Sequence, residues 1–329
     1  MNRLTRRILL YSTILFFIFI VPAVLFYAWG YSFDWEKKKP VMTGAIYLKS
    51  TPKKADIELD GKLKDKTPSY IKRLRPKEYQ IKIIKDGFHS WQKKLRVESG
   101  FVTEAKNILL IPLNPYIEII EENLTDDFSL EKFLSQEKTD DIFYIQKPSY
   151  ILYRTDQVNS FQEQISLTPL PNTNEYEIFV SQNKRIAALS NDNELYSLNP
   201  ETKNFEIINQ DVKNAQFSND SKKLLYFTSN EIWVYYLEDI AIQPNKKAGA
   251  KELITRLSQK IKQAVWHGKT NEHIIFSVGN QIKIIELDGR DERNTIDIFQ
   301  SDTEQIGYNL KDDKLYFIKE GKLFAISLE

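Results

Sequence analysis

The 329-residue sequence contains no cysteine, and this absence excludes several kinds of site at once. Disulfide frameworks, thiolate zinc clusters and thiol nucleophiles all require cysteine. Histidine is nearly as rare, because His89, His267 and His273 are the only three in the chain. Their spacing fits no common metal-binding motif. A chain without disulfide bridges is compatible with an oxidising exterior but does not require one.

Glycine is also scarce, with 11 residues, and the sequence has neither a phosphate-binding glycine loop nor a Gly-x-Ser-x-Gly motif. No pair of carboxylates stands out as the acid and base of a glycosidase. The acidic pairs Asp126-Asp127, Asp140-Asp141 and Asp312-Asp313 lack the alternating spacing of a calcium loop, and we interpret them as solvated turns. We therefore predict no catalytic residue, no cofactor and no metal site, and a chain that is not an enzyme.

Charge is missing from one long stretch near the start of the chain, from Ile8 to Tyr31. At about 1.5 Å per helical residue, a run of this length crosses the roughly 30 Å hydrocarbon core of a bilayer. Aromatic residues gather at its far end, as they do at lipid–water interfaces. These residues are Tyr27, Trp29, Tyr31, Phe33 and Trp35. The run predicts a transmembrane helix.

A cleavable signal peptide is the main alternative to a permanent anchor. Its apolar region is usually shorter and ends at a small-x-small site, whereas this run is long and no Ala-x-Ala follows it. We predict an uncleaved signal anchor at 8–31, with a cytoplasmic tail at 1–7 and a linker at 32–42. Arginines before the run and lysines after it balance in the positive-inside rule. The N-terminal position of the arginines favours a single-pass cell-membrane protein with its bulk outside the cytoplasm.

Charge divides the remainder of the chain into two parts. Residues 43–113 hold 16 Lys and Arg against 8 Asp and Glu, a net charge of +8. Residues 114–329 hold 24 against 35, a net charge of −11. Two regions of opposite sign predict two domains, with the boundary at 113/114.

The smaller region shows short alternating strands separated by turn residues. The segment from Ala55 to Leu59 alternates with period two and ends at Asp60-Gly61, a strong hairpin signal. This pattern predicts a small antiparallel β-sandwich. The region resembles the PEGA domain family in the order and spacing of its motifs. The matching elements are Gly44, Ser50 to Ala55, Asp60-Gly61, Thr67-Pro68, Pro76 to Tyr79 and Gly87-Phe88, with Lys54 and Lys77 in place of two family glycines.

The resemblance implies an extracytoplasmic accessory or binding module and no catalytic activity. Basic residues in this region suggest one function, which is contact with anionic lipid headgroups or acidic wall polymers near the membrane. The alternative is an ordinary solvated β-surface. The candidate residues are Lys62, Lys64, Lys66, Lys72, Arg73, Arg75 and Lys77. Nucleic acid is not an expected partner, because the location is unsuitable and no recognition motif is present.

The larger region carries a degenerate repeat of two β-rich stretches joined by a short polar turn. Tyr150, Leu195, Ile232, Ile282 and Leu323 occupy matching positions, with separations of 45, 37, 50 and 41 residues. Periods near 40 to 45 residues with several strands each are typical of β-propeller blades. The segments 215–224 and 265–269 also resemble the turn motif of TolB-like and WD-type propellers.

The repeats predict a five-bladed propeller, and a strongly diverged sixth blade is the alternative. The last residues, 323–328, look like the third strand of a blade. We predict that 116–121 pairs with 323–328 and closes the ring, because an unpaired edge strand would otherwise remain exposed. The predicted fold is therefore all-β after one transmembrane helix.

Aromatic residues make up 12% of the chain, and four of them are candidates for a ligand platform. Trp233, Tyr235, Tyr236 and Tyr308 have the chemistry for stacking on a glycan or binding a peptide. Filling of blade cores is the alternative, because aromatic residues are enriched in strands.

The leading hypothesis is a non-catalytic cell-envelope protein that presents a propeller for binding. Its expected partners are the membrane and an envelope protein, a cell-wall or surface glycan, or an anionic polymer. The alternative is an extracytoplasmic propeller enzyme, either a glycosidase or a peptidase-associated protein. An enzyme of this kind needs carboxylates that converge at the central funnel, and the sequence shows no such cluster.

Overall fold

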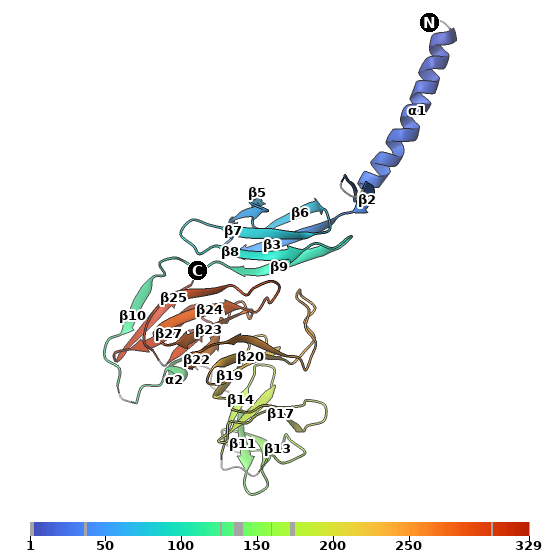
Figure 1. The fold of residues 1–329 in the computed structure, drawn as a ribbon. Helices are drawn as coiled ribbons and strands as arrows, with labels where there is room; N and C mark the ends of the chain where they lie inside the picture. Colours follow the sequence, from blue (N-terminus) through green and yellow to red (C-terminus); the bar gives the residue numbers. More distant parts are fainter. Residues whose placement is uncertain are drawn as a thin grey trace. The chain divides into compact units, whose positions relative to one another are not determined.

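The computed structural model describes residues 3–35, 38–125, 127–134, 141–158, 160–171, 175–303 and 305–328. Asp126 and Asp140 of the acidic pairs, with parts of the predicted tail and linker, lie outside the described residues. The chain forms two compact units, Met1–Leu110 and Ile111–Glu329. Figure 1 shows one long helix, with most of the remaining chain in strands.

Helix α1 (Arg3–Ala28) contains most of the predicted apolar run. It begins before Ile8 and ends before Tyr31, which instead starts a strand. The helix is long and apolar enough to cross a membrane, and none of its described residues is buried. The hydroxyls of Ser12 and Thr13 donate to the Leu9 carbonyl oxygen at 2.9 and 2.8 Å, so two of its few polar groups are satisfied within the helix.

A short antiparallel hairpin follows α1. Strand β1 (Tyr31–Asp34) pairs with β2 (Lys39–Met42), and Thr43 is tied back to the Gly30 carbonyl by its N–H at 2.9 Å and its hydroxyl at 2.6 Å. Gly30 has φ of +86°, a conformation that glycine adopts without a steric penalty. The described residues of the predicted linker at 32–42 therefore belong to a hairpin.

The rest of the first unit is a sandwich of two sheets. One sheet has the order β6-β3-β9 and the other β5-β4-β7-β8. Their buried residues form one apolar cluster, with Ile46 and Leu48 from the first sheet and Ile57, Ile81 and Leu95 from the second. The strands are β3 (Gly44–Thr51), β4 (Asp56–Leu59), β5 (Lys62–Lys66), β6 (Ser69–Leu74), β7 (Glu78–Ile84), β8 (Trp91–Arg96) and β9 (Val102–Leu109).

The sandwich differs from the antiparallel prediction in one pair of strands. Strand β3 runs antiparallel to β6 but parallel to β9. The chain returns from β8 so that β9 lies beside β3, the first strand of the sandwich. Gly44 is required at this point, because a Cβ atom there would lie 2.3 Å from the Glu98 carbonyl oxygen and 2.8 Å from that of Phe101.

The second unit is a series of antiparallel sheets that follow one another along the chain. Five sheets lie in its described residues, four with four strands and one with three. Each sheet is ordered along the chain except the last, which has the order β10-β28-β27-β26. Four-stranded sheets repeated in series are the arrangement of β-propeller blades. The number of blades stays a prediction.

The strands of this unit also follow a regular pattern along the sequence. Four of the repeats found in the sequence are the second and third strands of a sheet, and the faint copy near Tyr150 covers β11 and β12. The strands are β10 (Ile117–Glu121), β11 (Asp141–Gln146), β12 (Ile151–Asp156), β13 (Gln162–Gln164), β14 (Tyr176–Val180), β15 (Ile186–Ser190), β16 (Leu195–Leu198), β17 (Phe205–Asn209), β18 (Asn214–Phe217), β19 (Lys223–Phe227), β20 (Glu231–Tyr236), β21 (Lys251–Arg256), β22 (Ile261–Trp266), β23 (His273–Val278), β24 (Gln281–Glu286), β25 (Thr295–Gln300), β26 (Ile306–Asn309), β27 (Lys314–Lys319) and β28 (Lys322–Ser327).

The predicted closing pair is confirmed. Strand β10 pairs antiparallel with β28, with Ile117 opposite Ile326 and Ile119 opposite Phe324. Strand β28 is third in its sheet, as the sequence indicated, and β10 supplies the fourth strand. The chain therefore uses a strand from the start of the unit to cover the edge of its last sheet. The short helix α2 (Leu130–Leu134) packs on this sheet, where Leu130 joins the apolar cluster around Tyr316.

Neighbouring sheets pack in chain order and are joined by apolar clusters. Strand β14 contacts β18, β18 and β19 contact β22, and β22 contacts β26. Ala187 and Leu195 of one sheet meet Leu224 and Tyr226 of the next in a single buried cluster. The second strands of three sheets, β15, β19 and β23, are buried along their whole length because both of their faces are covered.

Polar contacts also link the turns between the first and second strands of successive sheets. The Gln182 side-chain amide donates to Asn219 Oδ1 at 2.8 Å, and the Asn219 backbone N–H donates to Asn271 Oδ1 at 2.9 Å. Lys269 pairs with Asp313 at 2.8 Å. These turns include the two segments that resemble propeller motifs, so the motif residues connect sheets as well as turning the chain.

Candidate functional site

The predicted basic residues of the small domain lie on two sheets. Lys62, Lys64 and Lys66 are on the fully exposed strand β5, whereas Lys72 and Arg73 are on β6. Lys66 pairs with Asp56 at 2.6 Å, so part of its charge is offset locally. The structure therefore divides the predicted set into at least two groups.

Arg73 and Arg75 lie beside the end of helix α1. The Arg73 guanidinium carbon is 3.4 Å from the centre of the Tyr27 ring, and the Arg75 Nη2 atom is 3.5 Å from the Phe33 carbonyl oxygen. Lys72 lies over the Tyr70 ring, with its Nζ atom 5.4 Å from the ring centre. Sequence reasoning placed these residues near the membrane but gave no sign that they touch the helix end.

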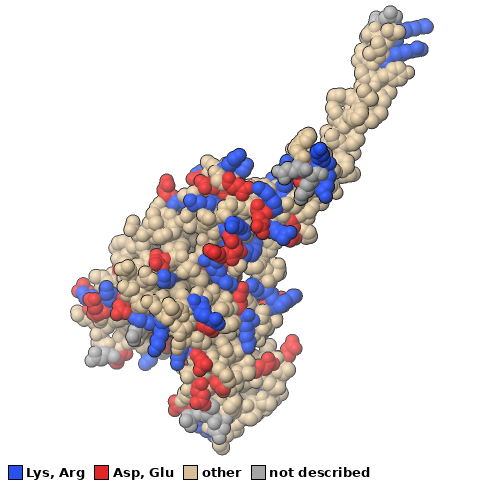
Figure 2. All heavy atoms as spheres, in the orientation of Figure 1, with Lys and Arg blue, Asp and Glu red and all other residues tan. Residues whose placement is uncertain are grey.

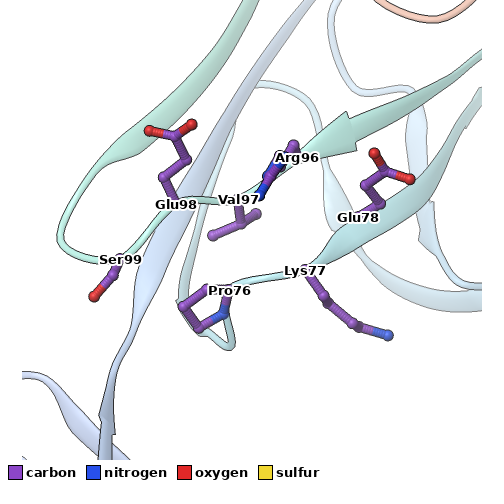
Figure 3. A pocket seen from close by; sticks show the side chains of 7 residues that line it. All are labelled: Pro76, Lys77, Glu78, Arg96, Val97, Glu98 and Ser99. Atoms are coloured by element: carbon purple, nitrogen blue, oxygen red, sulfur yellow. The ribbon is translucent and has the colours of Figure 1, made fainter.

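Lys77 belongs to a different surface. It pairs with Asp60 at 2.8 Å and lies over the Tyr79 ring at 4.5 Å. It also borders an open pocket of about 400 Å³ (Figure 3), together with Glu78, Arg96 and Glu98. The side chains of Arg96, Glu78 and Glu98 lie on one side in this view, while Lys77 extends the other way. Two acids balance two bases, so the pocket itself offers no excess positive charge.

The four predicted platform rings are not brought together. Trp233 and Tyr235 lie on one face of β20 and pack on the apolar cluster of the junction with the preceding sheet, whereas Tyr236 is buried on the other face. Trp233 stacks on Tyr226 with the rings 3° from parallel. Tyr308 lies on β26, in a different sheet. Alternation along a strand could have shown that Tyr235 and Tyr236 point to opposite faces.

Tyr235 lines a groove of about 340 Å³ between the β14–β17 and β18–β21 sheets, which we call the Tyr235 groove. Asn199, Glu201 and Glu206 face it from the first sheet, and Arg185 stands at its edge. Burial and the nearby Glu206 carboxylate raise the pKa of the Tyr235 hydroxyl. The groove therefore combines one aromatic wall with carboxylate and carboxamide groups.

A second pocket of about 190 Å³ lies between the β11–β13 sheet and the β14–β17 sheet. Four basic side chains line it and one acidic side chain, Glu163, opposes them. We call it the basic pocket. Apolar residues form the rest of its lining. The basic residues are Arg154, Lys184, Arg185 and Lys203, and the apolar residues are Phe143, Ile165, Ile186, Leu198 and Pro200.

The cations of the basic pocket are held by partial ion pairs. Arg154 contacts Asp141 at 3.3 Å and Glu163 at 2.6 Å, and Lys184 shares Asp141 at 3.1 Å. The Arg154 Nε atom is nevertheless buried without a hydrogen-bond partner in the described part of the chain. Arg185, Leu198 and Pro200 also line the Tyr235 groove, so the two sites adjoin. Sequence reasoning missed this site because its residues come from two neighbouring sheets and are scattered along the chain from 143 to 203.

The two histidines of the second unit are buried together in the β22–β23 turn. Thr270 Oγ1 lies 3.4 Å from His267 Nδ1 and 3.0 Å from His273 Nδ1, and the Tyr308 ring packs at a tilt against His267 with ring centres 4.7 Å apart. Burial, helped by the His267 charge, lowers the pKa of His273 to about 3. His273 is therefore neutral at physiological pH, which suits a packing role at a junction of sheets.

A buried ion pair lies next to these histidines. Lys223 is almost completely buried and donates to Glu272 at 2.6 Å and to the Asn271 carbonyl at 2.7 Å. Burial raises the pKa of Glu272 more than Lys223 lowers it. Within the described residues, no group of three or more His, Asp or Glu side chains is placed to hold a metal ion.

Comparison with known proteins identifies a domain family in one part of the chain. The PEGA domain family matches residues 43–109, in agreement with the resemblance of the sequence motifs. A comparison with curated proteins finds no match.

Several β-propeller proteins are among the similar solved structures. YCF48 from Cyanidioschyzon merolae has 12% identity and a TM-score of 0.42, over 76% of this chain and 77% of that one. A structure of YCF48 bound to D1 peptide has 14% identity and a TM-score of 0.40, over 87% and 95%. Hsv2 from Kluyveromyces lactis has 13% identity and a TM-score of 0.40, over 84% of this chain and 71% of that one.

A gluconolactonase from Xanthomonas campestris is also similar, with 12% identity and a TM-score of 0.36, over 57% of this chain and 68% of that one. The structural neighbours thus include an enzyme. The chain is mostly β, carries one apolar N-terminal helix, matches the PEGA domain at residues 43–109 and has β-propellers among its structural neighbours.

Proposed function

We propose that this chain is a membrane-anchored, extracytoplasmic binding protein without catalytic activity. Helix α1 supplies the anchor, because it carries no charge from Ile8 to its end at Ala28 and its described side chains are all exposed. The match to the PEGA domain supports a location in the cell envelope. The binding part is the unit of serial sheets, whose grooves lie between rigid elements of the fold.

The basic pocket is the observation that carries this proposal. The second unit has an excess of acidic residues, yet four basic side chains line one small cavity together with apolar residues. This chemistry fits a protein segment that pairs a carboxylate with an apolar side chain.

The Tyr235 groove favours a second candidate ligand, a glycan. Tyr235 offers a half-buried ring for stacking, and Asn199 and Glu206 offer hydrogen-bonding groups beside it. Because the two sites share Arg185, one partner can occupy both. No activity is proposed for either site, since Arg154, Arg185 and Lys184 of the basic pocket are engaged in ion pairs rather than poised beside a nucleophile.

A binding experiment tests the basic pocket directly. The full chain in nanodiscs is titrated with peptides that join Asp, Glu or a free terminal carboxylate to Leu or Phe. Lys203→Glu should weaken binding by about tenfold or more, because it removes a charge-assisted contact and repels the carboxylate. Lys213→Glu is the matched control, since Lys213 is exposed and lines neither site. Equal affinity in all three proteins would contradict the proposal.

The glycan candidate and the lack of activity need separate measurements. Glycan-array binding that is lost in Tyr235→Ala but kept in Lys203→Glu would assign the partner to the Tyr235 groove. Turnover of a glycoside, lactone or peptide panel by the purified chain would overturn the non-catalytic proposal.

The anchor and its orientation are tested in intact cells. The chain has no cysteine, so Lys213→Cys gives a single labelling site. Labelling by a membrane-impermeant maleimide is expected if this unit lies outside the cytoplasm. An intact mass that includes residues 3–28 shows that the helix is retained, whereas a mass lacking it would identify a cleaved signal peptide.

A further inference from the structure

The end of strand β6 is built in a way that directs Arg73 toward the membrane helix. Gly44 and Ile46 of β3 pair with Leu74 and Ile71 of β6, so two residues of β6 oppose one of β3 in a β-bulge. Arg73 lies in this bulge with φ of +61°. Bulges redirect side chains, and a positive φ in a residue other than glycine costs about 1 kcal/mol or more. The Arg73 guanidinium rests on the Tyr27 ring as a result.

This contact fixes the depth of Arg73 relative to the proposed anchor. Tyr27 is in the last turn of α1, where the apolar run ends. In a membrane-spanning helix, such a tyrosine lies at the level of the lipid headgroups. Arg73, stacked 3.4 Å from the ring centre, must lie at the same level. Arg75 follows it, 3.5 Å from the Phe33 carbonyl oxygen in the hairpin.

The β1–β2 hairpin exposes large aromatic side chains beside these arginines. Trp35 is 76% exposed and Phe33 is 43% exposed, and the two rings meet edge to face at 4.8 Å. Trp29, between the helix and the hairpin, is 63% exposed. Amphipathic rings are costly to leave in water but are favoured at the bilayer interface.

The cations around these rings remain available for a ligand. Lys72, Arg73 and Arg75 are exposed, and none of them forms an ion pair with an acidic side chain in the described residues. Figure 2 shows basic side chains gathered at this end of the helix, below its uncharged length. The β5 lysines differ, because they lie on the other sheet of the sandwich.

We infer that the β1–β2 hairpin and residues 72–75 of the PEGA domain form a membrane-surface foot that binds anionic lipid headgroups. The aromatic side chains enter the interface, and Arg73 and Arg75 bind lipid phosphate. Arg73 is held between Tyr27 and the headgroup, where its planar guanidinium can stack and donate at once. The inference rests on the proposed anchoring by α1. It assigns the basic residues of β6 to lipid rather than to a wall polymer.

The test uses the full chain in nanodiscs of phosphatidylcholine, with or without phosphatidylglycerol. Ser32→Cys carries an environment-sensitive dye in the hairpin, because the natural chain has no cysteine. Phosphatidylglycerol should shield the dye from an aqueous quencher. Shielded dye reports hairpins docked on the bilayer, and quenched dye reports undocked ones. Arg73→Gln with Arg75→Gln should lower the ratio of docked to undocked protein by about fivefold per arginine. Arg73→Lys keeps the charge but loses the planar stack, and should give a smaller loss.

Lys62→Gln with Lys64→Gln is the matched control and should leave the shielding unchanged. An equal loss of dye shielding in this double variant would show a general attraction of charge to the bilayer and would overturn the inference of a membrane-surface foot. Equal shielding without phosphatidylglycerol would overturn the assignment to anionic lipid. Binding of soluble polyphosphate that needs Arg73 and Arg75, with no response to phosphatidylglycerol, would assign the arginines to a polymer instead.

Two further readouts separate this inference from the wider proposal. Unchanged thermal unfolding of each variant shows that the sandwich is intact. Loss of the chain from the nanodisc would refute the anchor itself, whereas peptide binding measured on the same samples reports on the basic pocket alone.

Discussion

The two units of this chain hold their strands together in different ways. The PEGA sandwich has one apolar cluster between two sheets, and the lysines of its edge strand β5 stay fully exposed. The unit of serial sheets has a separate apolar cluster at successive junctions and adds polar contacts between turns. Both units bury ionisable groups, since Lys93 is 0% exposed in the sandwich, and Lys223 and His273 are 1% and 5% exposed in the serial sheets.

The difference follows from the number of interfaces that each fold must specify. Two sheets that face one another share a single apolar layer, so their outer surfaces are free to carry charge. Sheets in series meet at several junctions, and apolar packing alone does not fix how far one slides along the next. Hydrogen bonds are directional, so the Gln182–Asn219–Asn271 contacts set the position of each turn on its neighbour.

The largest expected effect comes from breaking each core separately. Ile57→Ala in the sandwich and Leu225→Ala in the serial sheets each remove a fully buried side chain, which costs about 2–5 kcal/mol. Denaturant unfolding should show two transitions, with each variant lowering only one of them. A shared shift of one transition in both variants would show that the units unfold together.

Breaking one ion pair in each unit should also give clearly different losses of stability. Lys223→Met leaves Glu272 without its partner at a mostly buried position, and we expect a loss of about 3 kcal/mol. Lys66→Met, which breaks the exposed pair with Asp56, should cost less than about 1 kcal/mol. Unfolding midpoints measure both losses. Adding Glu272→Gln to Lys223→Met should recover much of the loss, and failure to do so would contradict this account.

Glycine-to-alanine substitutions compare how closely the backbone is packed at one glycine in each unit. Gly44→Ala should destabilise the sandwich by about 2–3 kcal/mol, because the new methyl would meet backbone oxygens that cannot move aside. Gly307→Ala in the last sheet meets the end of the Leu134 side chain, which can rotate, so its cost should be smaller. Thermal unfolding of the two variants, compared side by side, tests this order.

The smallest effect concerns pH and is expected only in the serial sheets. His273 has a pKa lowered to about 3 by burial, while an unfolded histidine titrates near 6.5. The unfolded chain therefore takes up a proton first as pH falls, and stability is lost progressively below about pH 6.5. Between pH 7 and pH 5 the loss should be about 2 kcal/mol.

His273→Gln should remove most of this loss from the transition of the second unit. His89→Gln is the control, because His89 lies in the other unit. The explanation fails if the His273→Gln protein keeps the full loss of stability between pH 7 and pH 5.

Much of the fold was readable from local patterns. The uncharged run predicted α1, the turn dipeptides predicted the strands around Asp60-Gly61, and the repeats located the central strands of four sheets. The pairing of 116–121 with the last strand was also predicted, because an exposed edge demands a cover. The parallel pairing of β3 with β9 was not predicted, since it joins strands from the two ends of the domain.

The candidate sites were less readable. Tyr235 was named from its chemistry, but its groove depends on Arg185 and Asn199 from the preceding sheet. The basic pocket brings Arg154 of one sheet together with Lys184 and Lys203 of the next, and no spacing along the chain marks them as a set. Arg73 and Arg75 were recognised as basic surface residues, but their contacts with Tyr27 and Phe33 depend on the bulge in β6.

The sequence by itself determined the membrane-length helix, the PEGA domain, the serial β-repeats and the opposite charges of the two regions. These features depend on neighbours along the chain, through hydrophobic periodicity and turn chemistry. The tertiary structure alone decided which charges are buried, which aromatic rings share a face and which cations surround a cavity. Those properties depend on residues that are distant in sequence, because strand pairing and sheet packing choose the neighbours of every side chain.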